Sequence, residues 1–307
     1  NERTEGFSIA ASYLSGTTYR VILYSISNLL LSPGDLSIIT FPVLIEDNVT
    51  PGVYFFNFED VIISDANNQN ISSVPLENGE ITILSLAELK LKTFLQGPYD
   101  TDTDLMKDDL RVNGLIPTTS PYPDNAIADA AVFNLGGISG VGLAENDIVD
   151  WIWVELRDEN DYTIIIESKS ALLQRDGDIV NTDGTSNLIF NTFEGNYYVL
   201  VNHRNHLGIL SAAPIVFSGT TTVDFSSNQN VIFGGVNALA DMGENVYAMF
   251  SGDFDSNGQV QNSDASDVIL LLGSSGYSPA DMDMNGQVQN TDINNIITPN
   301  TGNGEQF

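Results

Sequence analysis

The first two-thirds of the chain alternate between apolar and polar positions, which predicts β-strands separated by turns. In residues 7–86 the expected strands cover 7–13, 18–26, 36–45, 52–58 and 80–84, with turn signals at 32–35, 50–52 and 77–79. Residues 126–225 repeat the pattern, with strands expected at 148–157, 163–168, 187–191 and 195–202. The spacing of both sets predicts two β-sandwiches in tandem.

A short bridge, residues 89–113, joins the two predicted sandwiches. It starts with a strand and continues as a loop that leads into a helical turn. Within the loop, Asp100, Asp102 and Asp104 alternate as calcium ligands do. No glycine follows these aspartates, so a solvated loop or a helix cap explains them equally well.

Residues 253–264 and 281–292 carry the same acidic, glycine-centred pattern, and their starts lie 28 residues apart. Each segment places side-chain oxygens at loop positions 1, 3, 5 and 12 and a glycine at position 6, as an EF-hand-type calcium loop does. The oxygen donors are Asp253, Asp255, Asn257 and Asp264 in the first loop, and Asp281, Asp283, Asn285 and Asp292 in the second. The carbonyls of Gln259 and Gln287 are expected to supply position 7.

Calcium is the cofactor that this donor set predicts, with one ion in each loop. It is a hard cation that takes six to eight oxygen ligands in flexible geometry. Gly258 and Gly286 permit the sharp turn that brings the ligands together. Val260 and Val288 are expected to point inward and join the two loops. The alternative is a pair of metal-free turns, in which the clustered carboxylates would repel one another.

A short helix is predicted after each loop, at 263–273 with a glycine stop and at 291–299 with a stop before Pro299. A calcium loop followed by a single helix, present twice within residues 250–307, resembles a dockerin module. This resemblance implies calcium binding and a cohesin domain as partner.

The predicted partner-binding positions depart from the dockerin pattern. Dockerins commonly bind cohesin through loop positions 10 and 11 and nearby basic residues. Here those positions are Asn262-Ser263 and Asn290-Thr291, and no basic residue follows either pair. Calcium binding therefore carries over from the family better than partner recognition does.

Two weaker resemblances concern the strand-rich part. The order YRVILYSISN, SPGDLSIITFPVLI and TPGVYFFNFEDVIISDANNQNI resembles the later half of a cohesin-like sandwich without its early strands. Residues 90–225, with VDWIWVELRD and GNYYVLVNHRNHLGILS, resemble a module of large secreted surface proteins of Bacteroidetes-type bacteria, with a strand order like that of prealbumin-type stalk domains. The predicted fold is mainly β: an incomplete cohesin-like β-sandwich at 1–88, a second β-sandwich at 89–245, and a small α-helical dockerin-like module at 246–307.

Charge narrows the range of partners. The 307 residues include 41 acidic and 10 basic side chains, for a formal charge of −31, and the 103 residues after Arg204 contain no lysine or arginine. Nucleic-acid binding needs clustered positive charge, so it is not expected, and docking on anionic lipid is disfavoured for the same reason. The chain has no cysteine and no apolar run long enough to cross a membrane. An extracellular or cell-surface location is expected.

Other candidate chemistry is sparse. His203 and His206 would face opposite sides of a continuous strand, which argues against a shared metal. Trp151 and Trp153 share a strand face and are a candidate platform for a polysaccharide, with packing against a neighbouring element as the favoured alternative. No hydrolase or phosphate-binding motif is present, so an enzyme is not predicted.

The sequence thus favours a non-catalytic, calcium-stabilised extracellular protein for assembly or adhesion. Its expected partners are other protein chains, including copies of itself that associate head to tail. The alternative is a set of carbohydrate-binding accessory modules of a secreted glycan-degrading system.

Overall fold

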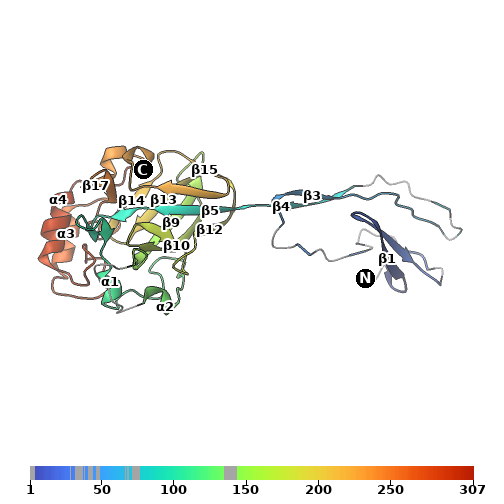
Figure 1. The fold of residues 1–307 in the computed structure, drawn as a ribbon, viewed down its shortest axis with the longest axis horizontal. Coiled ribbons are helices and arrows are strands. Elements are labelled where there is room, and N and C mark those ends of the chain that lie inside the picture. The colour runs from blue at the N-terminus through green and yellow to red at the C-terminus, as the bar shows by residue number, and fades with distance from the viewer. Residues whose placement is uncertain are drawn as a thin grey trace. The chain divides into compact units, whose positions relative to one another are not determined.

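The computed structural model describes residues 4–27, 29–31, 37, 39–40, 44–45, 49–65, 67, 69–70, 77–134 and 144–307. The chain divides into two compact units, Asn1–Leu84 and Ser85–Phe307. Strands predominate among the described elements of both units (Figure 1).

The first unit contains two separate hairpins in its described residues. β1 (Ser8–Ser15) pairs antiparallel with β2 (Thr18–Tyr24), and β3 (Gly52–Phe56) pairs antiparallel with β4 (Gly79–Ile83). Every residue of β1 and β3 is exposed, and no described residue of this unit is buried. A sandwich needs a second sheet over its apolar face, so the described residues do not form the sandwich core that the sequence predicts. Half of the strand expected at 36–45 lies outside the described residues, and the described half, 37, 39–40 and 44–45, is not in a strand.

A sheet of nine strands forms the centre of the second unit, counted over its described residues. Its main path runs β12–β5–β11–β10–β9–β13–β14, while β15 pairs with β13 and β16 pairs in parallel with β5. Figure 1 shows β9, β10 and β13 in the middle of this sheet. The strands are β5 (Leu86–Lys92), β9 (Ile148–Asp158), β10 (Ile165–Gln174), β11 (Asp178–Val180), β12 (Leu188–Phe193), β13 (Gly195–His203), β14 (His206–Leu210), β15 (Ile215–Phe217) and β16 (Thr220–Asp224).

A smaller sheet and several short elements complete the strand-rich part of this unit. The sheet has the order β17 (Leu239–Gly243), β18 (Val246–Met249) and β6 (Phe94–Leu95). A hairpin of β7 (Tyr99–Asp100) and β8 (Leu105–Met106) precedes two helical turns, α1 (Asp109–Val112) and α2 (Ala130–Phe133). Two further turns, η2 (Gln229–Val231) and η3 (Gly235–Asn237), lie between β16 and β17 in the chain.

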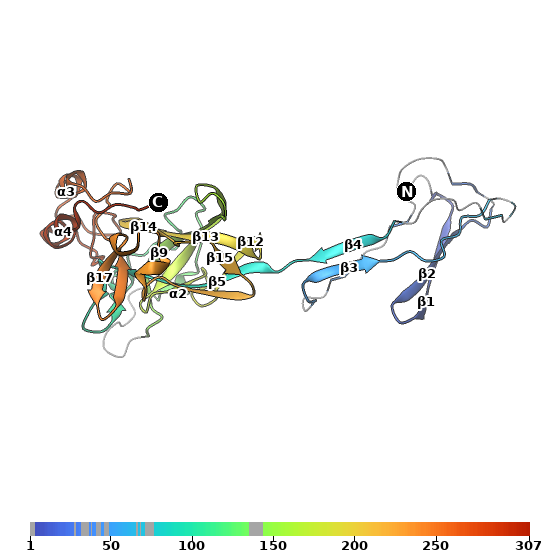
Figure 2. The ribbon, with the colours of Figure 1, turned by 90° about the horizontal axis from the view of Figure 1, so that it is seen from above.

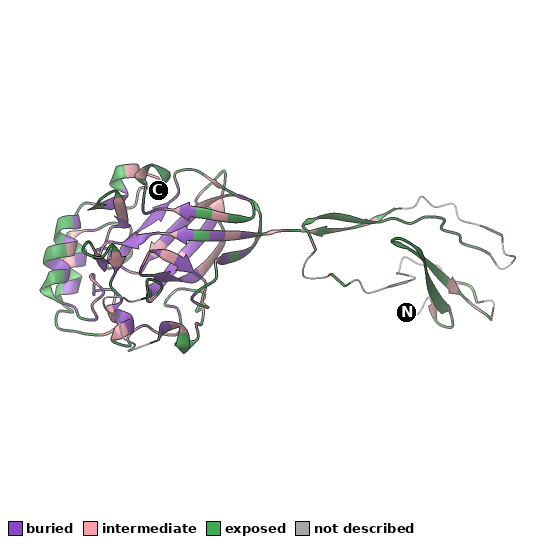
Figure 3. Ribbon diagram, viewed as in Figure 1, coloured by how far each residue is buried: buried purple, intermediate pink, exposed green. Residues whose placement is uncertain are grey.

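Buried residues gather in the second unit, where the strands of the large sheet supply most of the core (Figure 3). On β9, Ile152, Val154 and Leu156 are fully buried on one face, and Trp151 is fully buried on the other. A strand that is buried on both faces needs cover on both sides. The helical turn α2 contributes to the cover over Trp151, because its Phe133 packs beside the Trp151 ring.

The C-terminal part of the second unit has a buried apolar cluster of its own, which includes Val260 and Val288 as predicted. The helix α3 (Asn262–Ile269) follows the first loop, and a wide helical turn, η4 (Asp292–Ile297), runs into α4 (Thr298–Asn300) after the second. Figure 2 shows α3 and α4 side by side. The predicted stop before Pro299 is wrong, because proline lies in the first turn of α4, where its missing N–H costs no hydrogen bond.

The two compact units differ from the three predicted domains. The division after Leu84 lies near the predicted boundary at residue 88. Residues 246–307, however, belong to the same compact unit as residues 85–245. The physical reason is that β18 pairs with both β17 and β6, and Leu207 of β14 lies in the same buried cluster as Val260.

Candidate metal centre

Each C-terminal loop brings three carboxylates together. One carboxylate oxygen from each of Asp253, Asp255 and Asp264 lies within 4.8 Å of the other two, and the same holds for Asp281, Asp283 and Asp292. These are loop positions 1, 3 and 12 in both segments. Position 1 and position 12 are buried in each loop, whereas position 3 is more accessible.

The aspartate at position 12 closes each loop onto its own start. One carboxylate oxygen of Asp264 accepts the Phe254 amide at 2.9 Å, and the other accepts the Gln261 amide at 2.8 Å. Asp292 repeats both bonds, with the amides of Met282 and Gln289 at 2.7 Å each. The two loops therefore share one hydrogen-bond framework as well as one sequence pattern.

The aspartate at position 1 holds the turn around the glycine. Asp253 accepts the amides of Asn257 and Gly258, both at 3.0 Å. Asp281 accepts the corresponding amides at 3.1 and 2.7 Å. Gly258 and Gly286 have φ angles of +80° and +88°, a region that glycine enters without steric cost. The predicted role of the glycines as sharp turns is confirmed.

The residues at positions 5 and 7 complete the local framework. The side-chain oxygens of Asn257 and Asn285 accept the amides of Gln259 and Gln287 at 3.0 and 2.9 Å. The side chains of both glutamines accept from the glutamine two residues later, at 2.7 and 2.8 Å. The main-chain carbonyls of Gln259 and Gln287 are the ligands predicted for position 7, and that role stays a prediction.

Burial makes the charged form of these carboxyls costly. It raises the pKa of Asp253 to about 7, against the pull of two amide hydrogen bonds. It also raises the pKa of Asp281 to about 7, and it raises the pKa of Asp283 with help from the charge on Asp292. A divalent cation between the carboxylates would offset this cost. The donor set is all oxygen, so calcium fits the residues that are present.

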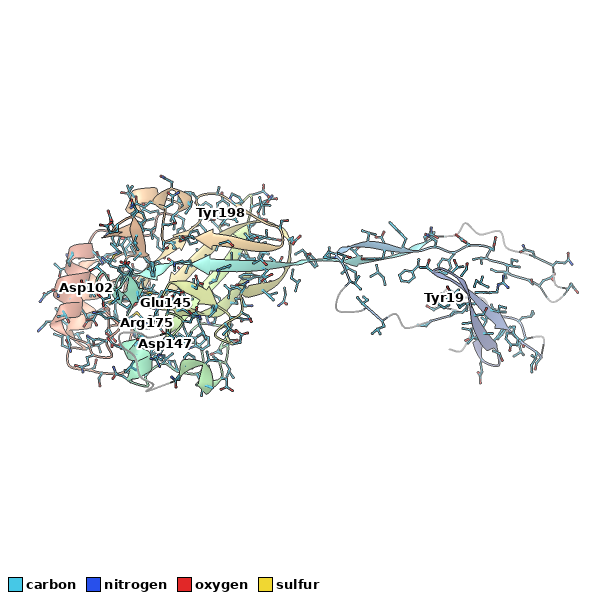
Figure 4. All side chains as sticks on the ribbon, in the orientation of Figure 1. Tyr19, Asp102, Glu145, Asp147, Arg175 and Tyr198 are labelled. Atoms are coloured by element: carbon cyan, nitrogen blue, oxygen red, sulfur yellow. The ribbon has the colours of Figure 1, made fainter. Side chains whose placement is uncertain are left out.

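The third candidate ligand set does not converge. The metal-compatible groups of three in the described residues are the two C-terminal loops. Asp100, Asp102 and Asp104 lie in and around the turn between β7 and β8, where Asp100 accepts the Asp102 amide at 3.1 Å and Asp104 accepts the Tyr99 hydroxyl at 3.3 Å. Figure 4 labels Asp102 on this turn. These local hydrogen bonds are those of a solvated loop, which was the alternative to a metal site.

The candidate tryptophan platform does not form, because Trp151 is completely buried, as the favoured packing alternative expects. Its indole N–H donates to the Pro117 carbonyl at 2.8 Å. Trp153 is half-buried, with its ring 5.6 Å from that of Tyr122 and its N–H donated to Glu155 at 2.7 Å. The segment before β9 covers this face of the strand, which is the packing alternative that the sequence left open.

The expectation for the two histidines is wrong, because the strand does not continue through them. β13 ends at His203 and β14 begins at His206, with Arg204-Asn205 as the two-residue connection. The rings face each other across this hairpin, with 3.0 Å between their Nδ1 atoms. Burial lowers the pKa of both histidines. An asparagine in a two-residue connection is a hairpin signal that could have revealed the turn.

A buried carboxylate, Asp150, anchors this hairpin and was missed at the sequence level. It accepts from His203 at 3.2 Å, from the Arg204 guanidinium at 2.9 Å and from the Tyr277 hydroxyl at 2.7 Å. The charge of Arg204 and the bond from His203 lower the pKa of Asp150, although its burial acts in the opposite direction. The contact with Tyr277 ties β9 and β13 to the segment that precedes the second loop.

No family model and no curated protein matches the chain. Solved structures that align with it include two interface mutants of a type II cohesin–X–dockerin complex from Acetivibrio cellulolyticus. The C-terminal interface mutant is 15% identical with a TM-score of 0.32, and the alignment covers 50% of this chain and 81% of that one. The N-terminal interface mutant is 15% identical with a TM-score of 0.31, and the alignment covers 49% of this chain and 80% of that one. These TM-scores are too low to show a shared fold.

The described helices add one further fact about location. No helix among the residues with a described placement is both long enough and apolar enough to cross a membrane.

Proposed function

We propose that residues 253–264 and 281–292 each bind one calcium ion, and that the chain is a non-catalytic extracellular protein for assembly or adhesion. The observation that carries the proposal is the duplicated triad of carboxylates, held in both loops by the same hydrogen bonds. Turn formation alone does not require three clustered carboxylates, whose mutual repulsion is costly, yet both loops have them.

Calcium suits these loops better than other cations. Zinc and copper sites use imidazole or thiolate ligands, whereas the donors here are carboxylate and amide oxygens. Magnesium requires near-ideal octahedral geometry and keeps several of its waters. A twelve-residue loop with donors at positions 1, 3, 5, 7 and 12 provides the larger and more flexible oxygen shell that calcium takes.

The role in assembly rests on exposed apolar side chains. In the first unit Tyr19 and Phe55 are 67% and 64% exposed, on strands that have no buried residue on either face. Exposed apolar surface of this kind commonly marks a protein contact. The carbohydrate alternative loses its support with the burial of Trp151.

Calorimetric titration with calcium tests the metal sites. The wild-type chain is expected to bind two ions, and Asp255→Asn and Asp283→Asn are each expected to weaken one site by about tenfold or more, because ligand charge sets affinity in such loops. Both targets are more accessible than their partners at positions 1 and 12. Asp267→Asn is the control, since Asp267 is exposed on α3 and lies outside both loops. A wild-type chain that binds no calcium would contradict the proposal.

A further inference from the structure

The connection between β13 and β14 lies against the starts of both C-terminal loops. Asn205, which is fully buried, occupies this connection. Its side-chain nitrogen donates to the carbonyl of Asp281 at 2.8 Å and to that of Pro279 at 3.1 Å. Its own main-chain carbonyl accepts the amide of Gly252 at 2.9 Å.

These contacts reach the first ligand position of each loop. Asp281 is position 1 of the second loop, and Gly252 directly precedes Asp253, position 1 of the first. One residue outside both loops therefore holds the main chain at the entry of each. A second bond joins the same two places, because the Ser251 hydroxyl donates to the Met282 carbonyl at 3.1 Å.

The large sheet fixes Asn205 in this orientation. Its side-chain oxygen lies 2.8 Å from Nδ1 of His206, which directs the amide nitrogen toward Asp281. The preceding residue, Arg204, is bonded to Asp150 of β9 and to the carbonyl of Ser278. The hairpin thus contributes contacts of its own to the position of Asn205, in addition to the bonds that Asn205 makes to the entries of the two loops.

We propose that Asn205 is a positioning residue that couples the two calcium loops to each other and to the large sheet; the proposal rests on the calcium sites proposed above. Binding at the first loop orders Gly252 and hence the Asn205 turn, which in turn orders the backbone of Asp281. The coupling is reciprocal, as binding linkage requires. The two sites therefore bind calcium with positive cooperativity, and calcium stabilises the hairpin at the end of β13.

Two variants test the role of the side chain. Asn205→Asp keeps the size and the oxygen next to His206 but removes the donor to Asp281, and Asn205→Ala removes both. In a two-site calcium titration both variants are expected to lose cooperativity and to weaken binding by about fivefold or more, within the usual range of coupling between sites. Asn196→Ala is the matched control, because Asn196 is exposed on β13, the strand that precedes the turn, and its side chain bonds to Glu159.

Hydrogen exchange on the unaltered chain tests the same idea without a substitution. Calcium is expected to slow exchange at the Gly252 amide and at the Leu207 amide, which donates to Phe250 at 2.8 Å next to the turn. Amides in the pairing of β9 with β10 serve as the internal reference. Failure of wild-type calcium binding would overturn the proposed function itself. Two ions bound independently, with unchanged affinity in both Asn205 variants and no slowing at these amides, would overturn the coupling alone.

Discussion

At the scale of single residues, Asp253 and Asp281 show how burial and function oppose each other in this chain. Each is buried, each accepts two main-chain amides, and each has a pKa raised to about 7. The form that would bind a cation is therefore the form that the fold disfavours in the absence of that cation. Stability and metal occupancy should depend on each other and on pH.

The first prediction concerns the calcium-free chain. Folded Asp253 and Asp281 keep their protons up to about pH 7, whereas the unfolded chain loses them near the ordinary value of 3.8. The folded state binds more protons in this interval, so the contribution of both groups to stability falls as pH rises from about 4 to 7. Chelator-treated protein is expected to show this decline in denaturant unfolding, and saturating calcium is expected to remove it. An equal decline in both conditions would contradict the assignment.

The histidine pair predicts the opposite dependence on pH. Burial holds the pKa of His206 well below 6.5. Its ring faces His203, which is hydrogen-bonded to Asp150, and Asp150 is in turn bonded to Arg204. The unfolded chain takes up protons first, so stability falls as pH drops below about 6.5. In the calcium-loaded protein, His206→Gln should flatten this acid loss, measured as unfolding midpoint between pH 7 and 5. If the unfolding midpoint falls equally steeply with pH in the variant and the wild type, the histidine pair is not the source of the acid loss.

The ligand residues of the loops were predictable because their spacing in the sequence determines how they converge in space. A twelve-residue loop carries its donors within one short segment, and the glycine at position 6 permits the required turn. Asn205 and Asp150 were not predictable in this way. Their contacts join segments that are far apart in sequence, and neither residue belongs to a local motif.

At the scale of elements, the loop glycines offer a matched comparison. Gly286 and Gly273 both have positive φ angles, +88° and +85°. A Cβ at Gly286 would lie 2.7 Å from Leu115, whereas one at Gly273 would meet open space. Gly273→Ala should cost about 1 kcal/mol of unfolding free energy for its backbone alone. Gly286→Ala should cost more and should also weaken calcium binding at the second loop; equal effects on stability and binding would contradict the packing described here.

Strands were predicted well where apolar and polar positions alternate regularly, and poorly where an apolar run interrupts that alternation. The strand expected at 148–157 corresponds to β9, which ends one residue later. The strand expected at 163–168 covers only the start of β10, which continues to Gln174 through fully buried positions. The missed part of β10 contains the run Ala171-Leu172-Leu173, which lacks the polar alternation on which the prediction depends.

At the scale of the whole molecule, calcium and self-association can be separated by experiment. Light scattering after size-exclusion chromatography is expected to show larger particles with calcium than with chelator. The double variant Asp255→Asn plus Asp283→Asn should abolish this calcium response. A chain that stays monomeric at high concentration with calcium present would contradict assembly from copies of itself.

The exposed strands of the first unit predict a separate effect on assembly. Tyr19→Ser plus Phe55→Ser should reduce particle size, because these side chains are 67% and 64% exposed on β2 and β3. The same double variant should leave calcium affinity unchanged, since both positions lie outside the second unit. Loss of calcium binding in this variant would show that the two units do not act separately.

Arg204, whose side chain is only 8% exposed, also has a consequence for proteolysis. Trypsin cleaves after lysine and arginine, and the 103 residues that follow Arg204 contain neither. The last tryptic site is therefore held inside the hairpin, bonded to Asp150 and stacked over the Tyr277 ring at 4.4 Å. Release of the intact fragment 205–307 would require the hairpin to open first, so its rate reports the population of that opened state. The rate at which trypsin produces the band of this fragment on a gel would thus measure how often the C-terminal segment detaches from the hairpin.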